Sequence, residues 1–245
     1  MKKILLTVFL AASTVFISCK DDDNVTETTK LPKSITSTYN RIDFTYNAAR
    51  QLVKITDKDS ETDYSETIFT YDTSGRPVKF VMLYNEDGAI ETYSYTISYP
   101  LENQAKIVSE DNETTIVKFD AKGQVTSFNN LSETINYTYD NRGNVVKIID
   151  EDSTVTASYN NNKGILSGVS SAKWVLLLTD FDLFYFGTNN PVSVSSVSEN
   201  NGNTYTSSEA YTYPAEHIID GYPTRMSVNY TENGSTENEV YTITY

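Results

Sequence analysis

Residues 137–143 read Tyr137-Thr138-Tyr139-Asp140-Asn141-Arg142-Gly143 and lead into 145–148, a run of β-branched residues around Lys147. Two aromatic residues alternate with a polar one, as in a strand that buries one face. Asp140 is typical of the residue that opens a turn, because its carboxylate can bond the backbone nearby. Gly143 supplies the positive φ that closes the turn. The stretch therefore predicts a β-hairpin.

The same pattern recurs along the chain. It appears at residues 69–75, as variants at 82–88 and 117–123, and without the glycine at 44–50 and 157–163. Phe119, Tyr139 and Tyr159 are spaced 20 residues apart, the length of one hairpin and its return. Further strands are predicted over 192–199, 204–213, 225–231 and 239–245. We expect one all-β domain over 34–245, a long antiparallel meander rolled into a barrel or half-barrel.

These hairpin units resemble the tyrosine-aspartate (YD) repeats of Rhs-type and wall-associated proteins, whose strands roll into a shell. The resemblance covers about residues 40–170 and matches a few positions in each unit. It implies a curved sheet of consecutive hairpins. YD shells are far longer and enclose cargo, which this chain is too short to do.

The first 18 residues have the features of an export signal. Met1-Lys2-Lys3 is basic, and an apolar run over 4–17 is too short to span a membrane as a helix. Phe16-Ile17-Ser18-Cys19 resembles the lipobox of bacterial lipoproteins. That resemblance implies cleavage before Cys19, a diacylglycerol on its thiol and a lipidated acidic tether over 19–33. The alternative is an ordinary secretory signal with an incidental cysteine.

Four residues follow this cysteine in a pattern with its own resemblance. Lys20, Asp21, Asp22 and Asp23 are similar to the export signal of surface lipoproteins in Bacteroidota. The resemblance implies the outer face of the outer membrane, with the periplasmic face and a plain solvated tether as alternatives. Lipobox, acidic residues and hairpins together resemble an uncharacterised family of Bacteroidota lipoproteins with a barrel or porin-like β-fold. That family has no established activity to carry over.

Net charge narrows the range of partners. The chain has 19 Lys and Arg against 33 Asp and Glu, a net charge of −14. Nucleic acid is excluded as a partner because its phosphates require a basic footprint. We expect membrane attachment through the lipid on Cys19 alone. Since Cys19 is the only cysteine, the fold has no disulfide to stabilise it.

One segment departs from the strand pattern. Its apolar residues follow a helical period from Trp174 to Tyr185. Ser170 or Ser171 suits an N-cap, and Gly187 suits the end of a helix. We predict a buried amphipathic helix over 171–186 that plugs the barrel. A helix that dips into the membrane and a pair of strands are the alternatives.

The chain ends on the alternating strand Tyr241-Thr242-Ile243-Thr244-Tyr245. Such an ending resembles the terminal signal of outer-membrane barrels. A membrane-spanning barrel needs strands of about 9–11 residues with an apolar outer band. Because most predicted strands are shorter, we expect the last strand to complete a water-soluble sheet.

Catalytic motifs are absent from the sequence. His217 is the only histidine, and its surroundings predict a surface loop. No nucleophile-elbow motif accompanies it, and one histidine with an acylated cysteine leaves no ligand set for zinc. Asp180 and Asp182 stand in an apolar run, where a raised pKa is conceivable. We predict no catalytic residue and no cofactor.

Two acidic stretches resemble weak cation sites. Asp57, Asp59, Glu61 and Asp63 alternate along 57–63, and three acids are consecutive at 150–152. Calcium prefers such oxygen ligands, but the EF-hand glycine and terminal glutamate are missing. Exposed acidic loops are the expectation, with no bound metal. Separately, Asp152-Ser153-Thr154 resembles the acceptor for O-glycosylation of exported proteins in the same bacteria, which implies a glycan on Ser153.

These observations favour a non-catalytic cell-surface lipoprotein that binds or scaffolds a glycan, a host protein or an envelope protein. Period-2 placement assigns most of the 19 tyrosines to the core, so glycan binding follows from location more than from residues. A carboxylate-dependent hydrolase acting on glycans and a passive structural protein of the envelope are the alternatives. Convergent carboxylates in a deep cleft would favour the hydrolase.

Overall fold

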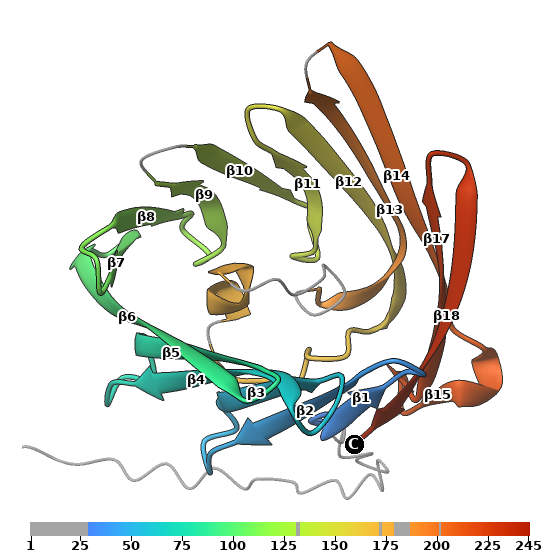
Figure 1. Cartoon of the computed structure of the whole chain (residues 1–245), viewed down its shortest axis with the longest axis horizontal. Coiled ribbons are helices and arrows are strands. Elements are labelled where there is room, and N and C mark those ends of the chain that lie inside the picture. Colours follow the sequence, from blue (N-terminus) through green and yellow to red (C-terminus); the bar gives the residue numbers. More distant parts are fainter. Residues whose placement is uncertain (1–28, 131–132, 172, 179–186, 201) are drawn as a thin grey trace, which may run out of the picture.

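The computed structural model describes residues 29–130, 133–171, 173–178, 187–200 and 202–245. Within these ranges sixteen antiparallel strands close into a barrel (Figure 1). β1 (Ser34–Thr36) closes it, because Ile35 lies opposite Ile42 on one side and Ile243 on the other. The predicted all-β meander is confirmed, and the barrel is closed. Residues 1–23, with the predicted signal peptide and Cys19, lie outside the described residues.

Each barrel strand pairs with its neighbours along the chain, apart from β1 with β18 and β14 with β17. The other barrel strands are β2 (Arg41–Tyr46), β3 (Leu52–Lys58), β4 (Asp63–Tyr71), β5 (Pro77–Glu86), β6 (Ala89–Leu101), β7 (Gln104–Ser109), β8 (Thr114–Phe119), β9 (Val125–Asn129), β10 (Thr134–Tyr139), β11 (Val145–Ile149), β12 (Ser153–Lys163), β13 (Asn189–Asn200), β14 (Asn203–Thr212), β17 (Arg225–Glu232) and β18 (Ser235–Thr244). β15 (Ile218–Ile219) and β16 (Tyr222–Pro223) form a small separate sheet. Two 3-10 helices, η1 (Lys173–Leu178) and η3 (Ala215–His217), complete the elements of the described ranges.

Four turns at one end of the barrel share one geometry. The N–H groups of Arg142 and Asn144 both donate to Asp140 Oδ1 at 2.9 Å, and Gly143 has a φ of 91°. The same bonds recur in the turns at 47–51, 72–76 and 120–124. In the first of these, Arg50 adopts the positive φ in place of glycine. The predicted hairpin turn is confirmed. We call this end, with the connections after β2, β4, β6, β8, β10, β12 and β14, the repeat rim.

The opposite end carries the connections after β1, β3, β5, β7, β9, β11, β13 and β17. Their sequences contain ten acids and neither lysine nor arginine. The acids are Asp59, Glu61, Asp87, Glu110, Asp111, Glu113, Glu133, Asp150, Glu151 and Asp152. We call this end the acidic rim. The five short turns of the repeat rim instead balance four acids with four basic residues.

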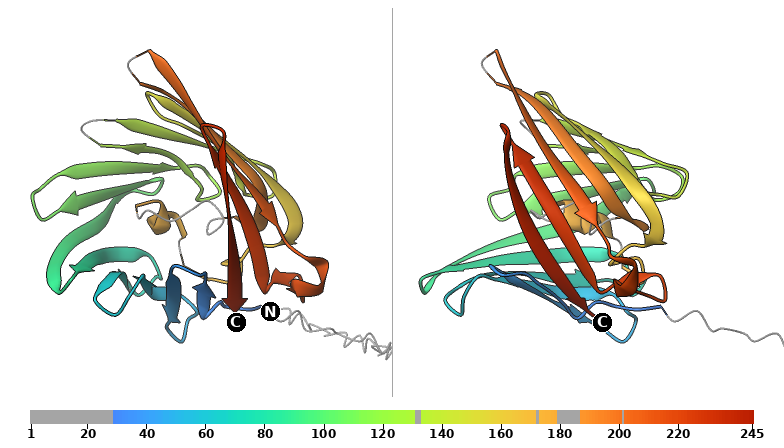
Figure 2. Two further views of the ribbon diagram at one scale, coloured as in Figure 1. Left: turned by 45° about the vertical axis from the view of Figure 1, so that its right-hand side comes forward. Right: turned by 90° about the vertical axis from the view of Figure 1, so that its right-hand side faces the viewer.

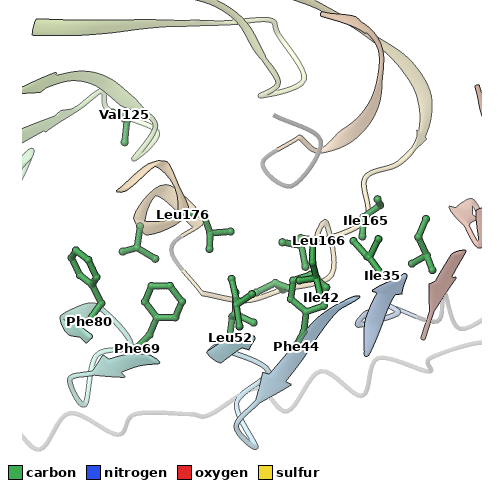
Figure 3. Packing of buried hydrophobic residues seen from close by; sticks show 14 of the residues in the cluster. Ile35, Ile42, Phe44, Leu52, Phe69, Phe80, Val125, Ile165, Leu166 and Leu176 are labelled. Carbon is green, nitrogen blue, oxygen red and sulfur yellow. The ribbon is translucent and has the colours of Figure 1, made fainter. Parts of the chain in front are cut away.

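The hydrophobic core lies inside the barrel, toward the repeat rim. Phe44, Phe69 and Phe80 extend from the wall toward the connection between β12 and β13 (Figure 3). We call residues 164–178 of this connection, apart from 172, the inner segment. It contributes Ile165, Leu166 and other apolar side chains to the same cluster. Both views in Figure 2 show η1 inside the ring of strands.

The predicted helical plug over 171–186 is wrong. Within the described residues this stretch holds only the 3-10 helix η1, and 179–186 lie outside them. The residues predicted as caps bond the barrel wall instead: Ser170 Oγ donates to the Ala49 carbonyl at 2.5 Å, and Ser171 Oγ accepts from Leu52 N at 3.4 Å. The apolar pattern marked burial, since Leu176 is 1% exposed, but not an α-helix.

The outer face of the wall is mainly polar on β13, β14, β17 and β18. Residues in register share a face, and Ser208 lies opposite Ser195 and Thr231, while Asn229 lies opposite Ala210 and Asn238. Apolar residues also stand on this face: Ile68 and Val81 lie opposite each other in register, and Ile149 and Val197 are exposed in another row. No helix within the described ranges has the length and apolar character needed to cross a membrane.

Candidate functional site

A cleft separates η1 from the wall at the repeat rim. Its larger part, a cavity of about 930 Å³, is lined by residues of the β4–β5, β6–β7 and β8–β9 turns and by Trp174. A smaller cavity of about 220 Å³ shares Gly123 and Trp174 with it and adds Tyr139 and Lys173. We call the two together the lumenal cleft.

Aromatic rings held in place by neighbours form its walls. The Trp174 ring meets Phe119 edge to face, with centroids 5.3 Å apart. Tyr99 donates its hydroxyl to the Pro77 carbonyl at 2.8 Å, and the guanidinium carbon of Arg76 lies 4.6 Å from its ring. Such flat, fixed faces suit the recognition of a ring-shaped ligand.

Lys173 is the unusual charge in the cleft. It is half-buried, and burial lowers the pKa of its amine to about 8. In the part of the chain that the structure describes, no carboxylate pairs with it. Burial and the charge of Asp120 raise the pKa of the neighbouring Tyr139 to about 12, so that phenol is neutral at pH 7. The cleft therefore holds a cation that a bound anion could satisfy.

A second group of polar side chains faces the lumen from β14, β17 and β18. Tyr211 donates to Glu209, Tyr241 donates to Glu239 at 2.7 Å, and the hydroxyls of Tyr230 and Tyr241 lie 2.9 Å apart. Burial and these partners raise the pKa of Tyr241. Glu209 and Glu239 were not singled out from sequence, because nothing distinguishes them locally among 33 acids.

The alternating acids of the β3–β4 hairpin do not assemble into a metal site. Asp57, Asp59 and Asp63 line a shallow cavity of about 200 Å³ with Glu86, whereas Glu61 is not part of it. Burial, then the charge of Asp59, raises the pKa of Asp57. Among the described residues no group of three or more His, Cys, Asp or Glu could hold a metal ion.

The remaining predicted positions are scattered. Ser153 begins β12, and its hydroxyl donates to Asp150 Oδ2 at 2.6 Å on the acidic rim. His217 ends η3 in the β14–β17 connection on the repeat rim. Asp180, Asp182, Cys19 and Lys20 to Asp23 lie outside the described residues.

Sequence reasoning missed the lumenal cleft. Its walls come from turns far apart in the chain, which only the closed barrel brings together. One available signal was a lysine at the edge of an apolar run beside the single tryptophan.

Comparison with known proteins gives no family. No family model matches the chain. No curated protein matches it either. Among solved structures, it is similar to a porin-like protein from Bacteroides uniformis, at 13% identity and a TM-score of 0.43, over 89% of this chain and 98% of that one.

Proposed function

We propose that the chain is a lipid-anchored binding or scaffolding module of the outer membrane, with its barrel in water outside the bilayer. Cys19 carries the lipid and begins the acidic tether over 19–33, whose last residues contact the barrel. The barrel presents its lumen and acidic rim to a partner and performs no chemistry. Its location on the outer face of the membrane follows from the resemblance of Lys20 to Asp23 to a surface-export signal.

The polar outer wall carries this proposal. Strand length alone does not separate the two kinds of barrel, because β5, β6, β12, β13, β14 and β18 have 10–13 residues. A membrane-spanning barrel, however, presents an apolar band about 25 Å tall to the lipid. Here the register places serine, threonine and asparagine on the outside of β13, β14, β17 and β18. Such a wall is suited to water.

The first residues that the structure describes lie at the repeat rim. The tether to the membrane therefore joins the barrel at this rim. Lys33 N donates to the Thr244 carbonyl, Tyr46 donates to the Pro32 carbonyl at 2.9 Å, and Lys30 pairs with Asp220 at 2.9 Å. From Cys19 to Lys30 an extended chain reaches about 40 Å at most. The repeat rim, with its balanced charge, therefore lies nearer the bilayer, and the acidic rim points away. Repulsion between acidic residues and anionic lipid favours the same orientation.

Packing in the lumen argues against a channel. Ile165, Leu166 and Leu176 of the inner segment are 0–1% exposed and pack on the barrel wall. A water-filled pore has a polar interior. Binding at the walls of the remaining cleft is the function that this interior supports.

Protease treatment of intact cells tests the proposal. We expect loss of the mature domain while a periplasmic control protein survives. We expect Cys19→Ala, expressed behind a secretory signal whose cleavage needs no cysteine, to leave the membrane fraction. Protection in intact cells with digestion after lysis would contradict the surface location. Retention of Cys19→Ala in the membrane fraction would contradict lipid anchoring.

A further inference from the structure

The lumenal cleft has the size of a small-molecule site. Its larger cavity of about 930 Å³ lies near the top of the range of about 300–1,000 Å³ found for ligand pockets. It is built from three turns of the repeat rim, two of which have the shared hydrogen-bonded geometry. Its frame is therefore set before a ligand arrives.

The aromatic walls select for a ring. Tyr99, Phe119 and Trp174 come from β6, β8 and η1, and each ring contacts another fixed group of the cleft. A pyranose has one face of C–H groups, which packs on an aromatic face, and hydroxyls around its edge. Polar groups that can meet such hydroxyls also line the cleft, among them Glu102, Asn103 and Lys122.

Arg76, Lys122 and Lys173 line the cleft together with the carboxylates Glu102 and Asp120, and Lys173 is the cation that favours a bound anion. Arg76 pairs with Asp72 at 2.9 Å, and Asp120 accepts the backbone N–H groups of its own turn. Lys173 lacks an ion-pair partner in the described chain, and burial lowers its pKa, so its ammonium is poorly solvated. A carboxylate beside it would remove that penalty, whereas a neutral ligand would leave it.

We propose that the lumenal cleft binds an acidic sugar, a chain of pyranose rings bearing carboxylates, with a ring packed on Trp174 and a carboxylate on Lys173. This inference rests on the proposed binding function and names the ligand class of the cleft. It adds no catalytic step, since neither side chain is asked to transfer a proton.

Trp174 is the single tryptophan of the chain, so its fluorescence reports on the cleft directly. The test uses the purified chain with Cys19→Ser, excited at a wavelength that spares tyrosine. Oligogalacturonate and a hyaluronan tetrasaccharide, which carries glucuronate, are the acidic probes. Methyl-esterified oligogalacturonate is the neutral control. We expect saturable change with at least one acidic probe and at least tenfold weaker binding of the ester.

Variants distinguish binding in the lumenal cleft from non-specific attraction of an acidic sugar to any positive charge. Lys173→Met is expected to lower affinity for the acidic probe at least tenfold, to the level of the ester, and Lys173→Arg to retain most of it. Lys79→Met removes a cation from the outer wall (its partner in register is Thr70) and is expected to change nothing. Trp174→Phe, followed by calorimetry, is expected to weaken every sugar.

Three results would overturn the proposal. These are no saturable response to either acidic probe, equal binding of acid and ester, or unchanged affinity in a folded Lys173→Met variant. None of them affects surface exposure or lipid anchoring, which protease treatment of cells measures independently. Failure of the ligand class and failure of the proposed function are therefore distinguishable.

Discussion

The two rims of the barrel are built on different principles. On the repeat rim, one turn geometry occurs four times, and the charges of the short turns balance. On the acidic rim, the connections differ in length and carry ten acids with no basic residue. Mutual repulsion there opposes compact packing. The difference indicates that the repeat rim and the inner segment stabilise the fold. The acidic rim contributes negative charge, which favours solubility and the proposed orientation.

The largest loss of stability is expected from a substitution at Asn144, on the repeat rim. Its side chain is fully buried, donates to Asp140 at 2.9 Å and to Asn189 at 3.1 Å, and accepts from Asn189 N at 2.9 Å. Asn144→Ala leaves buried partners unsatisfied and should lower the free energy of unfolding by about 3–4 kcal/mol. Urea unfolding measures this.

Asp150→Ala is the matched change on the acidic rim. Asp150 also accepts two backbone N–H groups and one hydroxyl, but it is only partly buried. Its loss should cost about 1 kcal/mol. Equal effects of Asn144→Ala and Asp150→Ala would contradict the contrast between the rims.

A substitution at Gly164 tests how tightly the chain is packed where it enters the lumen. A Cβ at this position would clash with the Gly187 carbonyl, where the chain enters and leaves the barrel interior. Gly164→Ala should therefore destabilise the protein by about 2–3 kcal/mol, read as a lower Tm. Gly88→Ala on the acidic rim meets no atom within 4 Å but has a φ of 90°, and should cost about 1 kcal/mol. A smaller loss in Gly164→Ala than in Gly88→Ala would show that the inner segment is not tightly seated.

Because Lys173 is partly buried in the inner segment, the free energy of unfolding should depend on pH through its amine. Burial lowers the pKa of its amine from 10.5 to about 8. Below pH 8 the folded state holds a poorly solvated ammonium, and between pH 8 and 10.5 the unfolded state binds more protons, so rising pH stabilises the fold. Lys173→Met should be more stable than the parent by about 1–2 kcal/mol at pH 7, a value reduced for partial exposure.

That difference should vanish near pH 10.5. Unfolding of both proteins in urea at several pH values measures this difference. Because the two proteins share all other charged residues, the effects of those charges cancel when the two stabilities are subtracted. Tyr139 stays neutral over this range, since its pKa is raised to about 12. A difference that stays constant from pH 7 to 10.5 would contradict the buried ammonium.

The smallest effect is expected at the tyrosines that link successive hairpins. Tyr46, Tyr71, Tyr99 and Tyr159 each donate to a backbone carbonyl at the start of an earlier strand or its flank, at 2.6–2.9 Å. Tyr159→Phe should lower stability by about 1 kcal/mol. Tyr205→Phe, at a ring 45% exposed on β14, should have no measurable effect in the same thermal scan. If the two changes are equivalent, these links do not stabilise the repeat rim.

Local features of the fold were predictable and distant ones were not. Asp140 and Gly143 define their turn through bonds to neighbouring residues, so sequence sufficed. Closure depends on Ile35 meeting Ile243, a pairing without a local signal, and the sequence left barrel and half-barrel open. The helix over 171–186 was mispredicted because Ser170 and Ser171 bond the wall. The cleft was missed because Arg76, Phe119 and Lys173 converge only after closure.

If the outer wall of the barrel faces water, only the lipid on Cys19 holds the protein to a membrane. Fractionation without detergent tests this in cells that express Cys19→Ser with residues 1–18 replaced by a secretory signal whose cleavage needs no cysteine. We expect a folded protein in the soluble fraction, with a β-rich circular dichroism spectrum. A folded protein that stays in the membrane pellet and leaves it only with detergent would contradict the account.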